Sequence, residues 1–325
     1  MIRLWNKLSD FVAPAFPPHR RLRIGMARRN RDPRFLFGDQ LAVEKEVLRC
    51  SFQDKMGFLP DLDHPRRFTE KIQWRKLFDR RRVFSLLVDK FRVRSWVEER
   101  VGSAYLIPLL YAADSVASLP FDSLPTPYIV KPSHSSGLKF PVHSTDQVDT
   151  PALNRMIGES MKVPYGILEI EWAYWHVKPM VIVEKLLVDG GRRIPSDFKI
   201  HCFGGEAHFV QVHTDRFTHF GQVTYTREWE KLEMEQRGIG EGRTVSAPAS
   251  LQEMLDIAEA LASGFDYVRV DLYDVDGRIY FGEMTIYPGS GFRRFTPDSW
   301  DLEWGQLWDL PQVTRDSRPG SPSRS

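Results

Sequence analysis

The chain has 325 residues, of which 42% are hydrophobic and 27% charged, and its formal net charge at pH 7 is +2. This composition excludes an intrinsically disordered chain and allows a large buried core, so we expect one compact enzyme of two lobes. Two cysteines, Cys50 and Cys202, exclude a disulfide framework and CxxC metal spacing, and they are typical of a reducing cytoplasm. The sequence contains no apolar run of the roughly 18 residues needed to span a bilayer.

Positive charge is concentrated at the start of the chain. Residues 1–100 contain 24 Lys and Arg against 13 Asp and Glu, whereas the remaining residues contain 21 against 30. Such a basic region could contact a membrane surface, nucleic acid or an acidic polymer, although solvated surface charge is the commoner explanation. Residues 1–12 could form a basic amphipathic helix, either packed on the protein or lying at a membrane surface. We expect a cytoplasmic protein without a nucleic-acid partner, and peripheral contact with the inner face of the membrane stays open.

The pattern of apolar residues divides the chain into four regions. We expect a basic, partly irregular arm over residues 1–39, a helical region over 40–115, a catalytic core in two lobes over 116–312, and a disordered tail over 313–325. Helical periodicity occurs at 41–50, 69–78, 83–99 and 251–263. Strand patterns occur at 128–131, 180–187, 196–203, 208–213, 267–273 and 279–286.

A polar loop follows the first of these strands. The strand 128–131 ends in Lys131, and residues 132–137 read PSHSSG, with Ser135, Ser136 and Gly137 at the end of the loop. Backbone amides of such a loop and a nearby ammonium group can neutralise a polyphosphate without a Walker sequence, which this chain lacks. A lysine at a strand end before a polar turn can equally be structural.

Charged residues also interrupt two later strands. Glu184 lies within the apolar run VIVEKLL, where a carboxylate requires a partner. That partner is either the amino group of an adenine ring or a neighbouring lysine in a salt bridge. In the strand 196–203, alternation places Asp197 and Lys199 on one face, where Lys199 could meet a phosphate and Asp197 could orient it. An ion pair across strands would give the same pattern.

The segment 265–291, FDYVRVDLYDVDGRIYFGEMTIYPGSG, predicts a hairpin that carries two carboxylates. Residues 274–277 suit a three-residue loop with a glycine bulge at Gly277, and this loop would place Arg269 opposite Glu283. Asp271 would then lie diagonally from Glu283, with the hydroxyl of Thr285 on the same face. Carboxylate and hydroxyl oxygens suit Mg²⁺ shared with substrate phosphates. The alternative is a solvated hairpin face with ordinary charges.

In this order, the segments resemble the ATP-grasp superfamily, and more closely its TupA-like branch, which is associated with bacterial cell-surface polysaccharide synthesis. The resemblance extends over residues 68–291. It rests on the segments FTEKIQWRKL, DKFRVRSWV, LPTPYIVKPSHSSG, EWAYWHVKPMVIVEKLL, PSDFKIHCFGG, TDRF, REWEKL, FDYVRVDLY and FGEMTIYPGSG. It implies an α+β ATP-grasp fold, in which ATP lies between two α+β lobes preceded by the basic helical region.

The resemblance also implies roles for particular residues. The expected catalytic residues are Lys131, Lys199, Arg269 and Arg293. The expected ATP-binding residues are Lys131, Ser135, Ser136, Gly137, Glu184, Lys185, Leu186, Asp197 and Lys199, with Glu184 at the adenine ring. The expected Mg²⁺ ligands are Asp271, Glu283 and Thr285. The sequence departs from the family pattern at Thr285, where many members have Asn, and no N-terminal βαβ domain is evident.

The resemblance implies a carboxylate-amine ligase that uses ATP and Mg²⁺ and acts through an acylphosphate on a surface-polysaccharide or amino-acid polymer precursor. Three other functions stay open. The first is a glycosyltransferase that uses a nucleotide sugar, because paired carboxylates can also hold a metal-bound diphosphate. The second is a kinase-like transferase that phosphorylates a sugar hydroxyl, and the third is a nonhydrolytic binding protein. No task for the segment from His213 to Arg216 follows from its spacing.

Overall fold

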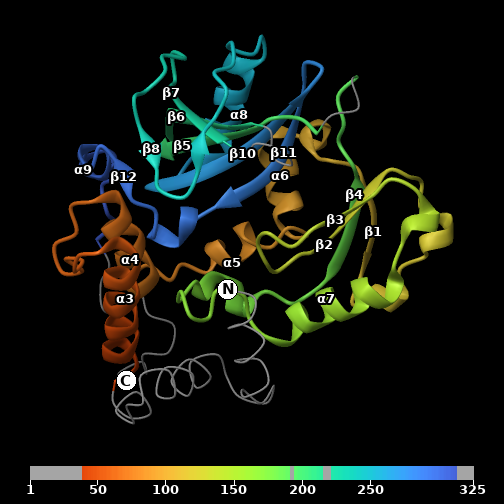
Figure 1. Cartoon of the computed structure of the whole chain (residues 1–325), viewed down its shortest axis with the longest axis horizontal. Helices are drawn as coiled ribbons and strands as arrows, with labels where there is room; N and C mark the ends of the chain where they lie inside the picture. The colour runs from red at the N-terminus through yellow and green to blue at the C-terminus, as the bar shows by residue number, and fades with distance from the viewer. Residues whose placement is uncertain (1–38, 191–193, 215–220, 313–325) are drawn as a thin grey trace.

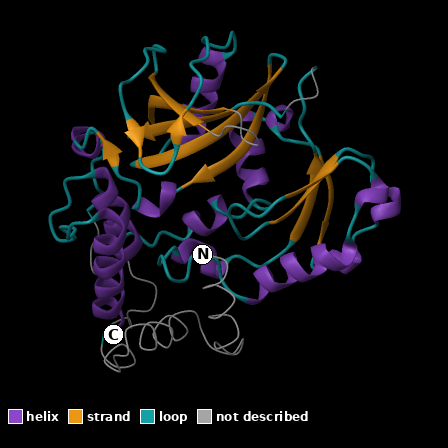
Figure 2. Cartoon of the chain, in the orientation of Figure 1, coloured by secondary structure: helices purple, strands orange, loops and turns teal. Residues whose placement is uncertain are grey.

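The computed structural model describes residues 39–190, 194–214 and 221–312 of the chain. Two sheets, antiparallel except for the β7–β9 pair at the edge of the larger one, face each other across the molecule, and helices cover their outer sides (Figures 1 and 2). The expected arm and tail, including the amphipathic segment 1–12, lie outside the described residues. No helix of the described part is long and apolar enough to cross a membrane.

The chain enters the described region through helices. Helix α3 (Gln40–Met56) begins at Asp39, whose carboxylate accepts a hydrogen bond from the backbone N–H of Ala42 at 3.0 Å. It ends at Gly57, whose positive φ of 82° allows the left-handed cap. Helix α4 (Phe68–Phe78) follows, and both helices lie beside the larger sheet (Figure 1). The expected helices at 41–50 and 69–78 are confirmed.

The expected single helix at 83–99 is wrong. The chain forms two short helices instead, α5 (Val83–Leu87) and α6 (Val93–Val101). The break occurs at Asp89, whose carboxylate accepts hydrogen bonds from the backbone N–H groups of Phe91 (2.9 Å) and Arg92 (3.2 Å). An Asp side chain that binds the backbone two and three residues later competes with helix continuation. The break turns Lys90 toward the space between the sheets.

The smaller sheet has the strand order β1-β4-β2-β3. Its strands are β1 (Leu109–Ala113), β2 (Tyr128–Pro132), β3 (Phe140–Val142) and β4 (Val181–Lys185). Helix α7 (Thr150–Lys162), which the sequence pattern missed, packs beneath it and buries Leu153 and Ile157 (Figure 1). Tyr128 and Val130 point into this small core, so Ile129 and Lys131 point toward the opposite sheet.

The larger sheet has the order β11-β10-β5-β6-β7-β9. Its strands are β5 (Asp197–Phe203), β6 (Glu206–Thr214), β7 (Gly221–Thr226), β9 (Gly240–Glu241), β10 (Tyr267–Val275) and β11 (Arg278–Thr285). Helix α8 (Leu251–Ala262) packs its apolar side on the outer face of this sheet. A two-stranded ribbon of β8 (Glu235–Gln236) and β12 (Phe295–Thr296) and helix α9 (Ser299–Gln306) complete the lobe.

Helix α4 is anchored to the lobe of the larger sheet by buried polar contacts. Asp301 of α9 accepts hydrogen bonds from the backbone N–H of Thr69 (2.9 Å) and from its hydroxyl (2.6 Å). The fully buried guanidinium of Arg75 binds the carboxylate of Asp266 at 2.5 Å and the carbonyl of Tyr267 at 2.9 Å. Buried charges are stable only when paired in this way, so α4 occupies a fixed position against the sheet.

The hairpin of β10 and β11 differs from the expected register. Its turn has two central residues, Asp276 and Gly277, both with positive φ, and not the expected three-residue loop with a bulge at Gly277. A bulge occurs instead at Gly282, because Leu272 pairs with Phe281 while Asp271 pairs with Glu283. Arg269 consequently lies opposite Thr285, and Asp271 lies directly opposite Glu283. The two carboxylates share one face, as expected, but for a different reason.

Candidate active site

A cavity of about 390 Å³ lies between the two sheets. This volume falls within the roughly 300–1,000 Å³ typical of ligand pockets. Ten of the residues expected from the sequence line it: Lys131, Ser136, Gly137, Glu184, Lys185, Leu186, Asp197, Lys199, Asp271 and Glu283. Lys90, Lys139 and Tyr273 also line it, and the sequence pattern did not single them out.

The smaller sheet contributes a buried carboxylate between two cations. Glu184, on β4, is 4% exposed, and its carboxylate lies 2.7 Å from the ammonium of Lys131 and 3.2 Å from the guanidinium of Arg94. Lys131 is on the neighbouring strand β2, and Arg94 comes from α6. Of the two partners considered for Glu184, the structure therefore shows a lysine in a salt bridge, with a second cation that the sequence did not suggest.

The loop after β2 is divided between the core and the cavity. Ser133, His134 and Ser135 are buried, whereas Ser136 and Gly137 border the cavity. Gly137 has a φ of 85°, a conformation that glycine adopts without steric cost. The end of the loop, Ser136 and Gly137, therefore borders the cavity, while its beginning is packed in the protein.

Lys90 connects this loop with the larger sheet. Its ammonium group donates a hydrogen bond to the carbonyl of Ser135 at 2.7 Å and lies 3.6 Å from the carboxylate of Glu283. Burial lowers the pKa of Lys90, and the negative charge of Glu283 works in the opposite direction. The sequence analysis placed Lys90 inside one continuous helix and therefore did not identify it as a cavity residue. The charged pair Asp89-Lys90 within the helix pattern was the signal that could have indicated a break there.

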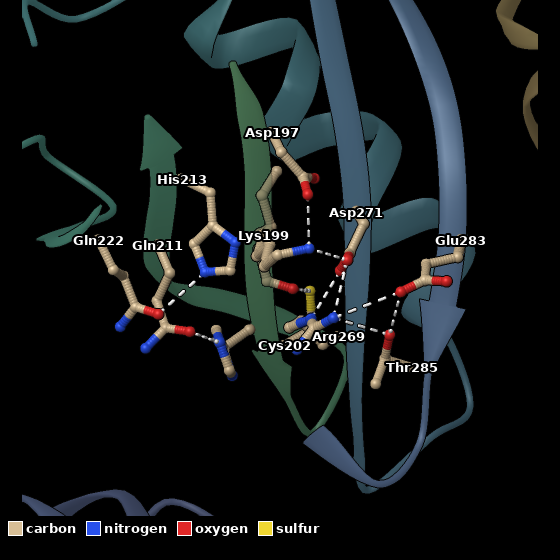
Figure 3. Close-up of polar contacts among 12 residues, drawn as sticks. Asp197, Lys199, Cys202, Gln211, His213, Gln222, Arg269, Asp271, Glu283 and Thr285 are labelled. Atoms are coloured by element: carbon tan, nitrogen blue, oxygen red, sulfur yellow. Dashed lines mark hydrogen bonds and ion pairs between the residues drawn. The ribbon is translucent and has the colours of Figure 1, made fainter. Parts of the chain in front are cut away.

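On the larger sheet, charged residues from adjacent strands form a continuous row (Figure 3). Lys199 of β5 lies between the carboxylates of Asp197, at 2.8 Å, and Asp271, at hydrogen-bond contact. Arg269 binds Asp271 through two nitrogens, at 2.6 and 2.7 Å. Both carboxylate oxygens of Asp271 thus have cationic partners, as its 1% exposure requires.

Glu283 is the more accessible of the two hairpin carboxylates. Its side chain is 30% exposed and lies 3.6 Å from the guanidinium of Arg269. Burial alone would raise the pKa of Glu283, but Lys90, Lys199 and Arg269 hold it below its ordinary value. The Thr285 hydroxyl is 3.4 Å from Glu283 and accepts a hydrogen bond from Arg269 at 3.0 Å. Glu283 therefore presents a permanent negative charge to the cavity.

These donors fit a magnesium ion held jointly with phosphates. The described residues contain no cluster of three or more His, Cys, Asp or Glu that could hold a metal alone. Asp271 and Glu283, directly opposite each other, provide the hard oxygen atoms of two carboxylates. Mg²⁺ sites in proteins commonly use one or two carboxylates and take their other ligands from water and substrate phosphates. Thr285 does not line the cavity, and its hydroxyl is occupied by Arg269.

Arg293 lies outside the cavity, beside the turn that follows β11. Residues 289–291 of this turn all have positive φ, and a Cβ on Gly289 would come within 2.7 Å of the Arg293 side chain. Burial and the nearby charge of Arg269 lower the pKa of Arg293.

Side chains of α4 form hydrogen bonds to the same turn. Lys76 donates hydrogen bonds to the carbonyl and the hydroxyl of Ser290, each at 2.9 Å, and Gln73 donates to the carbonyls of Ser290 and Gly291 at 3.0 Å. Burial lowers the pKa of Lys76 and raises that of Glu171, whose carboxyl group also forms a hydrogen bond with Ser290. Buried polar side chains therefore hold the turn in place.

The row of polar side chains continues beyond Lys199 onto β6 and β7. Register places Gln211 beside Lys199, and the amide oxygen of Gln211 is 2.9 Å from His201 Nε2. His213 Nε2 lies 2.9 Å from the amide oxygen of Gln222 (Figure 3). Burial, together with Lys199, lowers the pKa of His213 to about 4, so this ring is neutral at pH 7. Thr214 ends β6 and is buried, and the last two residues of the segment, Asp215 and Arg216, lie outside the described residues.

The cavity lies between two sheets, with a strand-end lysine on one side and a carboxylate pair on the other. The match to a family model identifies the chain as an ATP-grasp protein. The family comparison makes the assignment more specific. The chain belongs to the TupA-like ATP-grasp family, whose sequence model matches residues 70–308. The ATP-grasp superfamily includes carboxylate-amine ligases.

Solved structures of ligases show distant likeness to this chain. D-alanine–D-alanine ligase from Bacillus anthracis, complexed with ATP, has 17% identity and a TM-score of 0.35, with 62% of this chain and 54% of that chain covered. The L-amino acid ligase from Bacillus licheniformis has 16% identity, a TM-score of 0.40 and coverage of 79% and 57%. D-alanine–D-alanine ligase from Helicobacter pylori has 17% identity, a TM-score of 0.36 and coverage of 70% and 62%.

The chain thus spans less than two thirds of the length of each of these ligases. None of the curated proteins compared with this chain matches it. The family match, and not the distant structural likeness, carries the assignment.

Proposed function

We propose that this protein is an ATP- and Mg²⁺-dependent carboxylate-amine ligase that acts in the cytoplasm on a surface-polysaccharide or amino-acid polymer precursor. The observation that supports this proposal is the meeting of Lys131, Lys199 and the Asp271–Glu283 pair at one cavity between the sheets. These residues come from four strands in both lobes. Membership of the TupA-like ATP-grasp family supports ATP as the nucleotide.

In this proposal the smaller sheet binds the base and part of the phosphate chain of ATP. Glu184 and the following residues, Lys185 and Leu186, would face the adenine ring. Lys131 would move its ammonium group from Glu184 to a phosphate, and the neighbouring Arg94 would then continue to balance the charge of Glu184. Ser136 and Gly137 would close over the phosphates and limit access of water.

The larger sheet would hold the reacting end of the nucleotide. Glu283 and Asp271 would bind Mg²⁺, which would neutralise charge on the transferring phosphoryl group. Lys199 and Lys90 border the same part of the cavity and would contact phosphate oxygens. Arg269 would maintain the orientation of Asp271 through its two hydrogen bonds. Because each of these groups has its position fixed by a strand partner, little reorganisation is required during the reaction.

The proposed reaction has two steps. A carboxylate oxygen of the acceptor attacks the γ-phosphorus of ATP, the bond to the β-phosphate oxygen breaks, and ADP leaves. The nitrogen of an amine then attacks the carbonyl carbon of the acylphosphate, inorganic phosphate leaves, and the amine loses a proton to give the amide. Arg293, beside the turn at residues 289–291, would bind the acceptor carboxylate or the acylphosphate oxygens.

The nucleotide is tested by thermal unfolding with ATP, ADP, GTP and UDP-sugars, each with and without Mg²⁺. A ligand that binds only the folded state raises the unfolding temperature, so we expect a shift with ATP that increases with Mg²⁺. Lys131→Ala should reduce this shift. Lys178→Ala is the matched control, because Lys178 is on the same lobe but is 64% exposed and paired with Asp114. An equal shift in both variants would remove Lys131 from the phosphate site.

The reaction class is tested by ATP turnover with mixtures of uronic acids and amino acids. A ligase of this mechanism turns over ATP continuously only when both a carboxylate and an amine are present, and it then releases ADP and phosphate in equal amounts. Sugar transfer from a UDP-sugar without ATP consumption would show a glycosyltransferase instead. A phosphorylated sugar product would show a kinase-like transferase, and nucleotide binding without turnover of any mixture would show a binding protein.

A further inference from the structure

A second cavity, of about 570 Å³, lies on the outer side of the two-stranded ribbon β8–β12. Three arginines border it, Arg67, Arg237 and Arg294, together with the carboxylates of Glu235 and Asp298. Asp298 is already neutralised, because its carboxylate lies 2.8 Å from the guanidinium of Arg67. The cationic groups left without a carboxylate partner among the described residues are those of Arg237 and Arg294.

The register of the ribbon brings these two arginines together. Phe295 pairs with Gln236, and the backbone N–H of Arg237 donates to the carbonyl of Arg294 at 2.8 Å, which continues the antiparallel ladder by one step. Arg237 and Arg294 are therefore directly opposite each other. Residues in this relationship have Cβ atoms about 5 Å apart, and like charges there destabilise the pair.

The backbone also determines on which side these arginines lie. Phe295 and Gln236 are 4% and 8% exposed and point into the core. Since successive residues of a strand alternate, Arg237 and Arg294 point outward into the cavity, and both are exposed. The guanidinium group of Arg294 lies beside Gly57, at the end of α3, where an ideal Cβ would be in ordinary van der Waals contact with it at 3.5 Å.

Arg293 and Arg294, which are consecutive in the chain, direct their side chains to two different sites. The side chain of Arg293 folds over Gly289, at the turn assigned above to the acceptor, whereas Arg294 enters the outer cavity. The two residues are neighbours in the chain, with Cα atoms about 3.8 Å apart, but their side chains lie at different places. The outer cavity is therefore a place separate from the cavity between the sheets.

We propose that Arg237 and Arg294 form a binding site for an anionic group, a carboxylate or a phosphate, separate from the cavity between the sheets. The proposal goes beyond the proposed ligase function and does not depend on it. The opposed guanidinium groups provide several N–H donors in a geometry that matches either anion. An anion bound between the two guanidinium groups would offset the repulsion between their positive charges.

The test measures the reactivity of individual arginines. The protein is treated with 4-hydroxyphenylglyoxal, and the modification rate of each arginine is followed by peptide mass spectrometry, with inorganic phosphate, glutarate or sodium chloride at equal ionic strength. Phosphate or glutarate should slow modification of Arg237 and Arg294 at least about fivefold relative to chloride, as expected for a site near saturation. Arg155, an exposed arginine on α7, is the internal control and should react at the same rate throughout.

Arg237→Gln provides the matched variant, since it should abolish the protection of Arg294 while the rate at Arg155 stays unchanged. Protection by phosphate alone assigns a phosphate-bearing ligand to this site, and protection by glutarate assigns a carboxylate-bearing one. Equal rates in all three salts, or protection of Arg155 to the same degree, would overturn the subsite. The shift of the unfolding temperature by Mg²⁺ and ATP is measured separately, so failure of the nucleotide proposal is distinguishable from failure of this one.

Discussion

Asp271 lies directly opposite Glu283 because Gly282 is accommodated as a bulge in β11. A Cβ on Gly282 would lie 3.0 Å from the carbonyl oxygen of Asp271 and 2.9 Å from the ring of Tyr273. We expect Gly282→Ala to lower the free energy of unfolding by about 1–3 kcal/mol and to weaken the Mg²⁺-dependent ATP shift, because overpacking displaces the strand. Urea unfolding measures the first effect and thermal unfolding the second.

The control for this variant is Gly158→Ala in helix α7, where a Cβ would meet no atom within 4 Å. Alanine is favoured over glycine within a helix by about 1 kcal/mol, so this variant should be at least as stable as the parent protein. Equal stability of the two variants would show that the bulge does not require glycine.

The two carboxylates of the hairpin should respond differently to neutralisation. Glu283→Gln should leave the unfolding temperature nearly unchanged without ligands but abolish the effect of Mg²⁺, because the side chain is partly exposed. Asp271→Asn should also destabilise the protein, by about 3–5 kcal/mol, because Lys199 and Arg269 lose a buried partner. Urea unfolding and Mg²⁺ titration of both variants test this separation. Similar losses of stability would contradict it.

Ser290 adopts a φ of 57°, which costs a residue with a Cβ about 1–2 kcal/mol. Both Ser290→Ala and Ser290→Gly remove the hydroxyl that Lys76 contacts, but only glycine relieves the backbone. We therefore expect the glycine variant to be more stable than the alanine variant by about 1 kcal/mol in urea unfolding. At Ser263, where φ is −54°, the order should be reversed. The same order at both positions would argue against backbone strain in the turn.

Asp301 should make stability depend on pH. Burial raises the pKa of its carboxyl group from 3.8 to about 6 in the folded protein. The folded state therefore holds a proton that the unfolded state releases, so this contribution to stability is fully present below pH about 4 and is lost as pH rises through about 6. The loss is on the order of 3 kcal/mol.

Replacing Asp301 by Asn keeps an oxygen acceptor for the backbone N–H of Thr69 and removes the titration. Urea unfolding between pH 4 and 7 should show a smaller decline of stability for this variant than for the parent protein. Asp298→Asn is the control, since the Asp298 side chain is 60% exposed. Identical pH profiles of the Asp301 variant and the parent protein would contradict the assignment.

Strand alternation was sufficient to identify much of the cavity from the sequence. Lys131, Glu184, Lys199 and the two hairpin carboxylates are all strand residues, and a period of two determines the face on which each lies. The bulge at Gly282 was not foreseeable, because a one-residue irregularity depends on the packing of Tyr273 against the glycine. The sequence analysis therefore placed Asp271 and Glu283 on the same face correctly, although the type of turn from which it derived this placement was wrong.

Residues contributed by helices were harder to identify. Lys90 reaches the cavity only because the carboxylate of Asp89 interrupts the helix. The periodicity of apolar residues is evaluated over many residues, so it does not detect a break at a single position. Arg94 meets Glu184 across 90 residues of sequence, and nothing in either local pattern indicates that contact. The opposed Arg237 and Arg294 likewise arise from a two-residue ribbon too short to give a strand signal.

Each of the two sheets has its own apolar core. Lys90 touches the loop of the smaller lobe at Ser135 and the larger sheet at Glu283, so its ammonium group connects the two lobes across the cavity. In the proposed complex with ATP, the phosphates would compete for this same ammonium group. Nucleotide binding would then replace contacts between the lobes by contacts with the ligand, so that the two would be linked.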